Sequence, residues 1–272
     1  DRANVRYFMP AGLLLSAAMN FGFGMSSVAW AFGLFWLANG WFQGMGFPPC
    51  ARALTHWFAP KERGVKFSIW NTSHSIGAAL VFILCGWLVT YNWRLAFYVP
   101  GILAVLCALF LLDRLRDTPA SLGLPPVEEY VKGEEPEETQ EEAERDFGRV
   151  VLEYVFSNPM IWVVSFANFF VYTVRYSVVD WGPTFLKETR GLDILNSSRV
   201  MSAYEIAGVA GMLLSGWATD KLFKGRGGRT CFISMCLCSI CVLLFWKLNS
   251  PSLLVNAVLL CGVGLFVYGP QA

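Results

Sequence analysis

Residues 7–51 form a charge-free run of 45 residues, YFMPAGLLLSAAMNFGFGMSSVAWAFGLFWLANGWFQGMGFPPCA. A helix needs about 20 mostly apolar residues to cross the hydrocarbon core of a bilayer, so this run can supply two spans. Further runs without Asp, Glu, Lys or Arg cover residues 67–93, 95–112, 154–174, 230–246 and 248–272. The pattern predicts an all-α membrane protein that crosses the bilayer several times.

The composition excludes a water-soluble globule. Of the 272 residues, 55% are hydrophobic and 15% charged, whereas a soluble domain has about 25% charged residues. The net charge of +1 lacks the basic excess of a nucleic-acid-binding protein. The eight cysteines lie in or beside apolar segments and lack zinc-site spacing. We therefore expect no disulfide framework, no metal site and no cofactor.

Eight candidate helices follow from the charge-free runs and the turn signals between them, at residues 7–25, 28–55, 65–90, 93–112, 159–186, 199–222, 230–246 and 253–272. If the loops alternate between two sides, 15 of the 21 Lys and Arg residues fall on one side and five on the other. The positive-inside rule makes the first side cytoplasmic. Because the bias depends on this alternation, it also supports the count of eight helices.

The stretch between the fourth and fifth helices is strongly acidic. Residues 113–153 hold 13 of the 20 Asp and Glu residues and five basic ones, which is typical of a solvated linker. We therefore predict an N-terminal bundle at residues 1–112, an acidic cytoplasmic linker at 113–157 and a C-terminal bundle at 158–272. Four helices on each side of a linker is the layout of a transporter whose two bundles rock about a central cavity.

One arginine, Arg175, lies near the middle of the helix expected at 159–186. An arginine at mid-membrane costs between about 2.5 and 17 kcal/mol depending on the assay, so it marks a functional site or needs a partner such as Asp180 or Glu205. A binding role is favoured, because the guanidinium stays protonated and matches a phosphate or carboxylate bidentately. Tyr172, one helical turn earlier, either donates a hydrogen bond to the same anion or packs against a neighbouring helix.

A second polar group interrupts the helix expected at 65–90. Asn71 and His74 are three residues apart and share a helix face. Such a stripe lines a cavity or makes hydrogen bonds to another helix, and the spacing leaves both interpretations open. Because imidazole and phosphate monoesters change charge over the same pH interval, protonation of His74 would follow the charge of a phosphate ligand. For Glu205, a structural or gating role fits at least as well as ligand contact.

Two loops carry related charged sequences. The chain opens with DRANVR before a span, and GWATDKLFKGRGGR follows the sixth expected helix. Both resemble the signature G-x-x-x-D-[RK]-x-G-[RK]-[RK] of the major facilitator superfamily, a two-bundle fold of twelve helices. The resemblance implies a fragment with about eight of the twelve transmembrane helices, helices three to ten, the last one truncated. The residues assigned to this loop motif are Asp1, Arg2, Gly216, Asp220, Lys221 and Arg226.

Five longer segments are more specific: NGWFQGMGFPPCARALTHWF, ERGVKFSIWNTSHSIG, LRDTPASLGLPPVEEY, FFVYTVRYSVVDWGPTFLKE and VGLFVYGPQ. They resemble the organophosphate:phosphate antiporter family, which includes bacterial glycerol-3-phosphate and hexose-6-phosphate transporters and a related hexose-phosphate sensor. In that family an arginine from each half clamps the phosphate, with a histidine of the fifth helix between them. The resemblance assigns the second-half arginine to Arg175 and the histidine to His74, and it implies a first-half arginine upstream of Asp1.

The same resemblance implies roles for further residues. The substrate-binding positions that it implies are Arg175, His74, Tyr172, Asn71, Gln43 and Tyr268. Asp180 and Glu205 match acidic positions that form salt bridges or act as gates during transport. The substrate is left open, because SLGLPPVEEY and DWGPTFLKE resemble the glycerol-3-phosphate branch, whereas YGPQ resembles the hexose-phosphate and sensor branch.

The expected function is therefore exchange of inorganic phosphate for glycerol-3-phosphate or hexose-6-phosphate by alternating access. The alternative is a non-transporting hexose-phosphate sensor of the same fold. A proton-coupled drug exporter fits less well, since HSIGAALV lacks a Gly-Pro motif, and an enzyme is not expected because no nucleophile and base appear at working spacing. We expect a monomeric, multi-pass protein of the bacterial inner (plasma) membrane, whose partners are the organophosphate, inorganic phosphate and the lipid bilayer, with no nucleic acid.

Overall fold

The computed structural model describes residues 4–125, 127, 156–224 and 226–271, and every regular element in these ranges is helical. The prediction of an all-α protein is therefore confirmed. The chain forms two compact units. The first comprises the described parts of Asp1–Ser73 and Leu84–Glu134, and the second comprises His74–Ile83 and the described part of Glu135–Ala272. The bundle boundaries at residues 112 and 158 stay a prediction.

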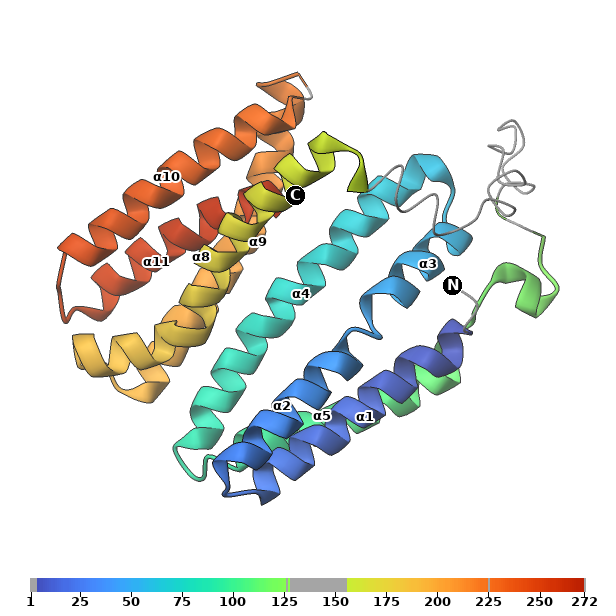
Figure 1. Cartoon of the computed structure of the whole chain (residues 1–272), viewed down its shortest axis with the longest axis horizontal. Helices are drawn as coiled ribbons and strands as arrows, with labels where there is room; N and C mark the ends of the chain where they lie inside the picture. The colour runs from blue at the N-terminus through green and yellow to red at the C-terminus, as the bar shows by residue number, and fades with distance from the viewer. Residues whose placement is uncertain (1–3, 126, 128–155, 225, 272) are drawn as a thin grey trace. The chain divides into compact units, whose positions relative to one another are not determined.

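The first unit is built around α1 (Val5–Met25), which lies beside α2 (Ala29–Gln43) and α5 (Leu95–Arg114) (Figure 1). Phe23 of α1 stacks on Phe32 and Phe97, with ring centroids 4.5 and 4.4 Å apart. The start of α1 is tied to the end of α5, because the guanidinium Nε of Arg6 donates to the Leu112 carbonyl at 3.1 Å. A short helix, η1 (Pro119–Leu122), follows α5.

One predicted helix is divided in two. Residues 28–55 were expected as a single helix, but α2 ends at Gln43 and α3 (Phe47–Trp57) starts after a turn at residues 44–46. Pro48 and Pro49 explain the break, because proline has no N–H to donate to the carbonyl four residues earlier. Both are tolerated in the first turn of α3, where N–H groups have no intrahelical partner anyway. The next helix, α4 (Pro60–Val89), begins five residues earlier than predicted, with a proline at its first position.

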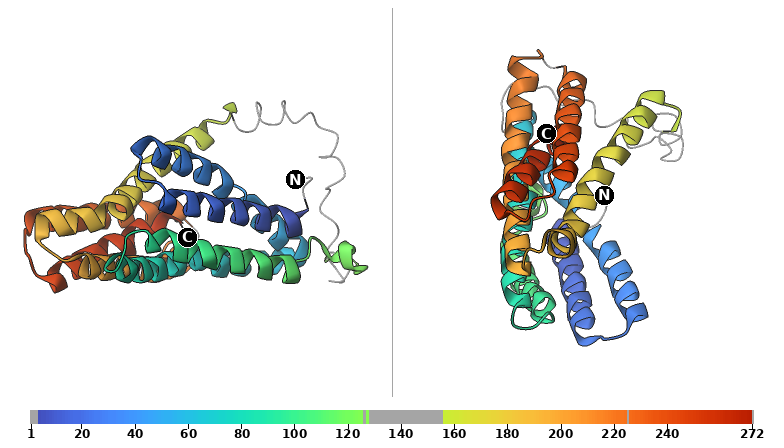
Figure 2. Two further views of the ribbon diagram at one scale, coloured as in Figure 1. Left: turned by 90° about the horizontal axis from the view of Figure 1, so that it is seen from below. Right: turned by 90° about the vertical axis from the view of Figure 1, so that its left-hand side faces the viewer.

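The second unit contains α8 (Pro159–Arg190), α9 (Ile194–Lys221), α10 (Gly227–Lys247) and α11 (Leu253–Val267), followed by η4 (Gly269–Gln271). Helix α11 contacts both α9 and α10, and the two views of Figure 2 show α10 and α11 side by side. Helix α9 starts five residues before its predicted start, because the Asp193 side chain accepts a hydrogen bond from the Asn196 N–H and caps the new first turn.

The core of the second unit depends on a close approach of α9 and α11. A Cβ atom placed on Gly211 would lie 1.9 Å from the Leu265 carbonyl oxygen, and one on Gly264 would lie 2.4 Å from the Tyr204 carbonyl oxygen. Small residues at such points let two helix backbones come together. The buried residues of this core are Val171, Leu186, Val200, Met201, Tyr204, Met212, Cys238, Leu260, Val263, Val267 and Tyr268.

Five segments within the described helices are long and apolar enough to cross a membrane: Val5–Met25, Ile69–Val89, Leu95–Arg114, Pro159–Arg190 and Gly227–Lys247. Helix α11 is apolar but shorter. Many large apolar side chains on these helices are exposed, among them Leu106 and Phe110 of α5 at 56% and 64%. A soluble protein rarely leaves so much apolar surface uncovered, whereas lipid chains cover it in a bilayer.

A buried arginine at the end of α8 has a structural role that the sequence did not reveal. Arg190 is 5% exposed and donates hydrogen bonds to the carbonyls of Phe245 and Leu248 and to the side chain of Asn249. These acceptors lie at the C-terminal end of α10, where carbonyl groups lack intrahelical donors and a cation is favoured. Arg190 therefore fastens the end of α8 to the end of α10.

Candidate functional site

Arg175 lies half-way along α8 and is only 6% exposed. Its guanidinium carbon lies 5.9 Å from the ring centroid of Tyr172, 5.7 Å from that of Tyr176 and 4.4 Å from that of Tyr268. The faces of aromatic rings attract a cation, more strongly where water is excluded. Tyr176 was not predicted as a site residue. Its position four residues after Tyr172, with which it stacks, is the sequence signal that could have identified it.

A chain of hydrogen bonds joins Arg175 to a buried carboxylate. The Nε of Arg175 donates to the Tyr268 hydroxyl at 3.1 Å, and that hydroxyl donates to Oε2 of Glu205 at 2.6 Å. Tyr268 and Glu205 are each 1% exposed. An isolated charge in such a dry environment is costly, so the link through Tyr268 stabilises both charged groups. Of the two acids predicted as partners of Arg175, Glu205 is the one in this chain.

Gly208 fixes the position of the Tyr268 ring. A Cβ atom on Gly208 would lie 2.6 to 2.9 Å from three atoms of that ring, which is closer than real Cβ contacts come. Gly208 lies on α9, one helical turn after Glu205, so the same face of α9 holds both the ring and the carboxylate that accepts from its hydroxyl. No pattern in the sequence distinguishes Gly208 from the other glycines.

Helix α4 contributes two residues to the second unit close to these groups. His74 is exposed and interacts electrostatically with Arg175. Ser75 is 1% exposed, and its side chain interacts with Glu205 and Tyr268. The structure thus brings four predicted residues, His74, Tyr172, Tyr268 and Glu205, to Arg175.

The other predicted residues lie outside this cluster. Asp180 is exposed and makes no ion pair with any residue that the structure describes. It follows Arg175 by five residues, which places it about 140° around the helix. Its gating role stays a prediction. Gln43 is exposed and Asn71 is half-buried. Both belong to the first unit, whereas Arg175 belongs to the second, so neither is a member of the Arg175 cluster.

The residues of the loop motif lie around the junction of α9 and α10. Gly216 and Asp220 belong to α9, and Lys221 is its last residue. Arg226 precedes α10 and is exposed, as is Lys221. Asp1 and Arg2 lie outside the described residues.

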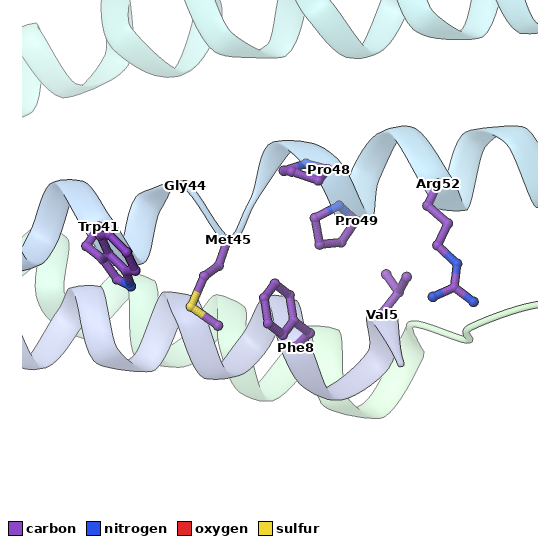
Figure 3. A pocket seen from close by; sticks show the side chains of 8 residues that line it. All are labelled: Val5, Phe8, Trp41, Gly44, Met45, Pro48, Pro49 and Arg52. Carbon is purple, nitrogen blue, oxygen red and sulfur yellow. The ribbon is translucent and has the colours of Figure 1, made fainter. Parts of the chain in front are cut away.

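A cavity of about 490 Å³ lies in the first unit, whereas the Arg175 cluster belongs to the second. Figure 3 shows its lining, with Val5 and Phe8 on α1 and the remainder on α2, α3 and the turn between them: Trp41, Gly44, Met45, Pro48, Pro49 and Arg52. Its one charged group, Arg52, is 3.8 Å from the Asp117 carboxylate. Gln43 lines a smaller cavity of about 190 Å³. No other predicted binding residue lines either cavity.

An arginine buried in an apolar, membrane-length helix is rare and marks a candidate functional site in a membrane protein. The family model of the Major Facilitator Superfamily matches residues 1–272. The chain belongs to the Major Facilitator Superfamily. This confirms the fold that the loop motif predicted, and the assignment of the α9–α10 junction to that motif stays a prediction.

Among members of the superfamily, the chain is similar to proteins named for organophosphates. It is 44% identical to the "Probable hexose phosphate transport protein" of Chlamydia pneumoniae, over 100% of this chain and 62% of that protein. It is 40% identical to the "Glycerol-3-phosphate transporter" of Bacillus subtilis (strain 168), over 99% of this chain and 62% of that protein. It is 38% identical to the "Membrane sensor protein UhpC" of Escherichia coli (strain K12), over 100% of this chain and 62% of that protein. The predicted resemblance to hexose-phosphate and glycerol-3-phosphate transporters and to a related sensor is confirmed.

The chain spans 62% of the length of these relatives. A solved structure supports the superfamily fold independently. The "Crystal Structure of A Bacterial Homolog to Human Lysosomal Transporter, Spinster, in Inward-facing And Unoccupied Conformation" matches 99% of this chain and 60% of its own, with a TM-score of 0.75 and 17% sequence identity. At that identity the match shows the fold alone.

Proposed function

We propose that the protein is a secondary transporter that exchanges inorganic phosphate for an organophosphate, glycerol-3-phosphate or hexose-6-phosphate, by alternating access. The observation that carries the proposal is Arg175, a guanidinium held half-way along a membrane-length helix at 6% exposure among three tyrosines. A planar, permanently charged fork in a dry site suits a phosphoryl group better than a neutral sugar or a cation. The names of the relatives support the same substrate class.

In this proposal Glu205 is the internal counter-ion of Arg175. Tyr268 joins the two groups by hydrogen bonds of 3.1 and 2.6 Å. A phosphate competes with this link for the guanidinium and for the tyrosine hydroxyl. Binding therefore exchanges one set of charge-assisted hydrogen bonds for another, which keeps the arginine satisfied both with and without its ligand. Such an exchange suits a carrier, which must release its ligand as well as bind it.

The proposed location, oligomeric state and bundle boundaries are inferred from the sequence. We place the protein in the bacterial inner membrane as a monomer, with bundles at residues 1–112 and 158–272 and the acidic linker at 113–157 in the cytoplasm. The excess of Lys and Arg on one set of loops supports this orientation. Asn71, Gln43 and Asp180 are assigned to the transport pathway by family resemblance.

The test uses the full-length protein reconstituted in vesicles loaded with phosphate. We expect external labelled phosphate to exchange with the internal pool, and an excess of external glycerol-3-phosphate or glucose-6-phosphate to compete. The stronger competitor identifies the organophosphate. Absence of both exchange and organophosphate binding would refute the proposal.

The second candidate is a sensor of the same fold, and the 38% identity to UhpC favours it. A sensor needs the Arg175 cluster for binding but not the exchange. Organophosphate binding to the purified protein, without exchange in the same vesicles, would identify a sensor.

His74→Ala is expected to weaken phosphate binding most at low pH. An imidazole gains a proton, and with it a positive charge, as the pH falls, so His74 adds to the positive charge beside Arg175 at low pH and not at high pH. The ratio of wild-type to variant affinity should therefore fall as the pH rises, and the ionisation of phosphate itself is common to both proteins. Binding of labelled phosphate at several pH values measures the ratio. His56→Ala, which changes an exposed histidine on α3, should follow the wild type; a constant ratio for His74→Ala would remove His74 from the site.

A further inference from the structure

The three tyrosines around Arg175 differ in how far they are exposed. Tyr268 is 1% exposed, whereas Tyr172 and Tyr176 are 39% and 50% exposed. Tyr172 and Tyr176 stack on each other, with ring centroids 5.7 Å apart and ring planes 21° apart, and we call them the tyrosine pair. Their centroids lie 5.9 and 5.7 Å from the guanidinium carbon of Arg175. A cation flanked by one buried ring and two accessible rings has a closed side and an open side.

The closed side of the guanidinium is occupied by buried side chains. The ring centroid of Tyr268 lies 4.4 Å from the guanidinium carbon, and its hydroxyl links Arg175 to Glu205. The Tyr268 ring also makes a T-shaped contact with Tyr204, which is 0% exposed, at a centroid distance of 5.9 Å. Such an interior is close-packed. A ligand that binds Arg175 therefore cannot place its bulk on this side without displacing the core.

An organophosphate has two chemically different parts. The phosphoryl group needs a cation and hydrogen-bond donors, whereas the carbon skeleton needs contact for its C–H groups and partners for its hydroxyls. Because an ester bond joins the two parts, the skeleton of a ligand held by Arg175 must lie close to the side chains that flank the guanidinium. Among the rings that flank it, those of the tyrosine pair have accessible surface. The negative face of a tyrosine ring attracts C–H groups, and its hydroxyl both donates and accepts.

We propose that the tyrosine pair is the subsite for the carbon skeleton of the organophosphate, while Arg175 holds the phosphoryl group. The inference deepens the proposed function and rests on it, because it requires an organophosphate ligand. Inorganic phosphate has no skeleton and leaves this subsite unused. The tyrosine pair therefore sets the preference for an organophosphate over inorganic phosphate, which Arg175 cannot do because it contacts only the phosphoryl group that both ligands share. Tyr176 thereby becomes a specificity-determining residue.

The experiment measures the Kd of two ligands for the purified full-length protein by titration calorimetry. One ligand is inorganic phosphate, and the other is glycerol-3-phosphate or glucose-6-phosphate, whichever the wild type binds more tightly. Tyr176→Ala removes both the ring and the hydroxyl, and we expect the Kd for the organophosphate to rise about tenfold more than the Kd for inorganic phosphate. Loss of the contact between ring and guanidinium affects both ligands alike, so the ratio of the two changes isolates the skeleton.

Two further variants support the comparison. Tyr176→Phe keeps the ring and removes the hydroxyl, so the Kd for the organophosphate should rise about threefold while that for inorganic phosphate stays within about twofold of the wild type. Phe170→Ala is the matched control, because Phe170 lies on the same helix, is 52% exposed and makes its ring contacts with Phe166 and Phe169. Both Kd values of this control should stay within about twofold of the wild type.

The outcomes separate this inference from the proposed function. If Tyr176→Ala raises both Kd values by the same factor, the inference is overturned, because the ring then acts on the guanidinium alone, and the transporter proposal is untouched. If Tyr176→Ala does not fold, Tyr176→Phe decides, and an unchanged Kd for the organophosphate overturns the inference. A wild-type protein that binds inorganic phosphate but neither organophosphate overturns the inference together with the proposed substrate class. One that binds none of the three ligands overturns the proposed function as well.

Discussion

Arg175→Lys is expected to abolish phosphate exchange, with kcat/KM lower by at least about 100-fold. The guanidinium offers a planar fork of donors to the phosphoryl oxygens while its Nε donates to Tyr268 and its face contacts three aromatic rings. Lysine keeps the charge but loses the fork, the stacking and the fixed Nε–H. Two lost hydrogen bonds to charged groups account for an effect of this size. Exchange of labelled phosphate in vesicles measures it.

Arg199→Lys is the matched control for this substitution. Arg199 is exposed on α9, and its Nη1 donates to the Asn196 side chain at 3.3 Å, a contact within its own helix. Exchange by this variant should stay within about twofold of the wild type. If Arg175→Lys exchanges phosphate as well as Arg199→Lys does, the Arg175 cluster is not the binding site.

Gly211→Ala is expected to destabilise the second unit by more than about 3 kcal/mol. The added Cβ would lie 1.9 Å from the carbonyl oxygen of Leu265, and 2.7 and 2.8 Å from its carbonyl carbon and Cα. These are backbone atoms of α11 and cannot rotate away, so the two helices must separate over their whole contact. Tyr204 and Tyr268 lie in the core that this contact closes. Thermal unfolding of the purified protein in detergent measures the loss.

The same helix supplies a control with the opposite expectation. Gly216 lies five residues further along α9, and a Cβ atom there would meet no heavy atom within 4 Å. Gly216→Ala should leave stability unchanged or raise it by up to about 1 kcal/mol, because alanine loses less backbone freedom on folding. If the Gly211→Ala protein unfolds at the same temperature as the Gly216→Ala protein, the close approach of α9 and α11 is wrong.

The membrane helices could be predicted because exclusion of charge is a local property of the sequence. The wrongly predicted helix boundaries also have local causes. The helix expected at 28–55 breaks before Pro48, and α9 starts at a cap that Asp193 forms. Both signals were present in the sequence, but apolar runs outweighed them. The end of α11 is a similar case, since residues 253–272 were expected as one helix and the helix stops at Val267, just before Gly269 and Pro270.

From residue spacing, only the part of the site that lies on a single helix could be predicted. Arg175 stood out because a charge inside an apolar run is rare, and Tyr172 lies one turn from it. Its hydrogen-bond partner Tyr268 is 93 residues away along the chain, and Glu205, between them, is 63 residues before Tyr268, so only family resemblance indicated Tyr268. Packing decides the role of Gly208, and no spacing rule within α9 selects it. The burial of Arg190 likewise depends on where α10 ends.

Helix α8 has 32 residues, so it is about 48 Å long, whereas the hydrocarbon core of a bilayer is about 30 Å thick. The helix that holds Arg175 at its midpoint must therefore lean or extend into the headgroup region, and the degree of lean changes with membrane thickness. Lipids with shorter or longer acyl chains would then alter the depth and direction of the guanidinium without any change in the protein. Hydrophobic mismatch thus becomes a property of the host membrane that acts directly on this site.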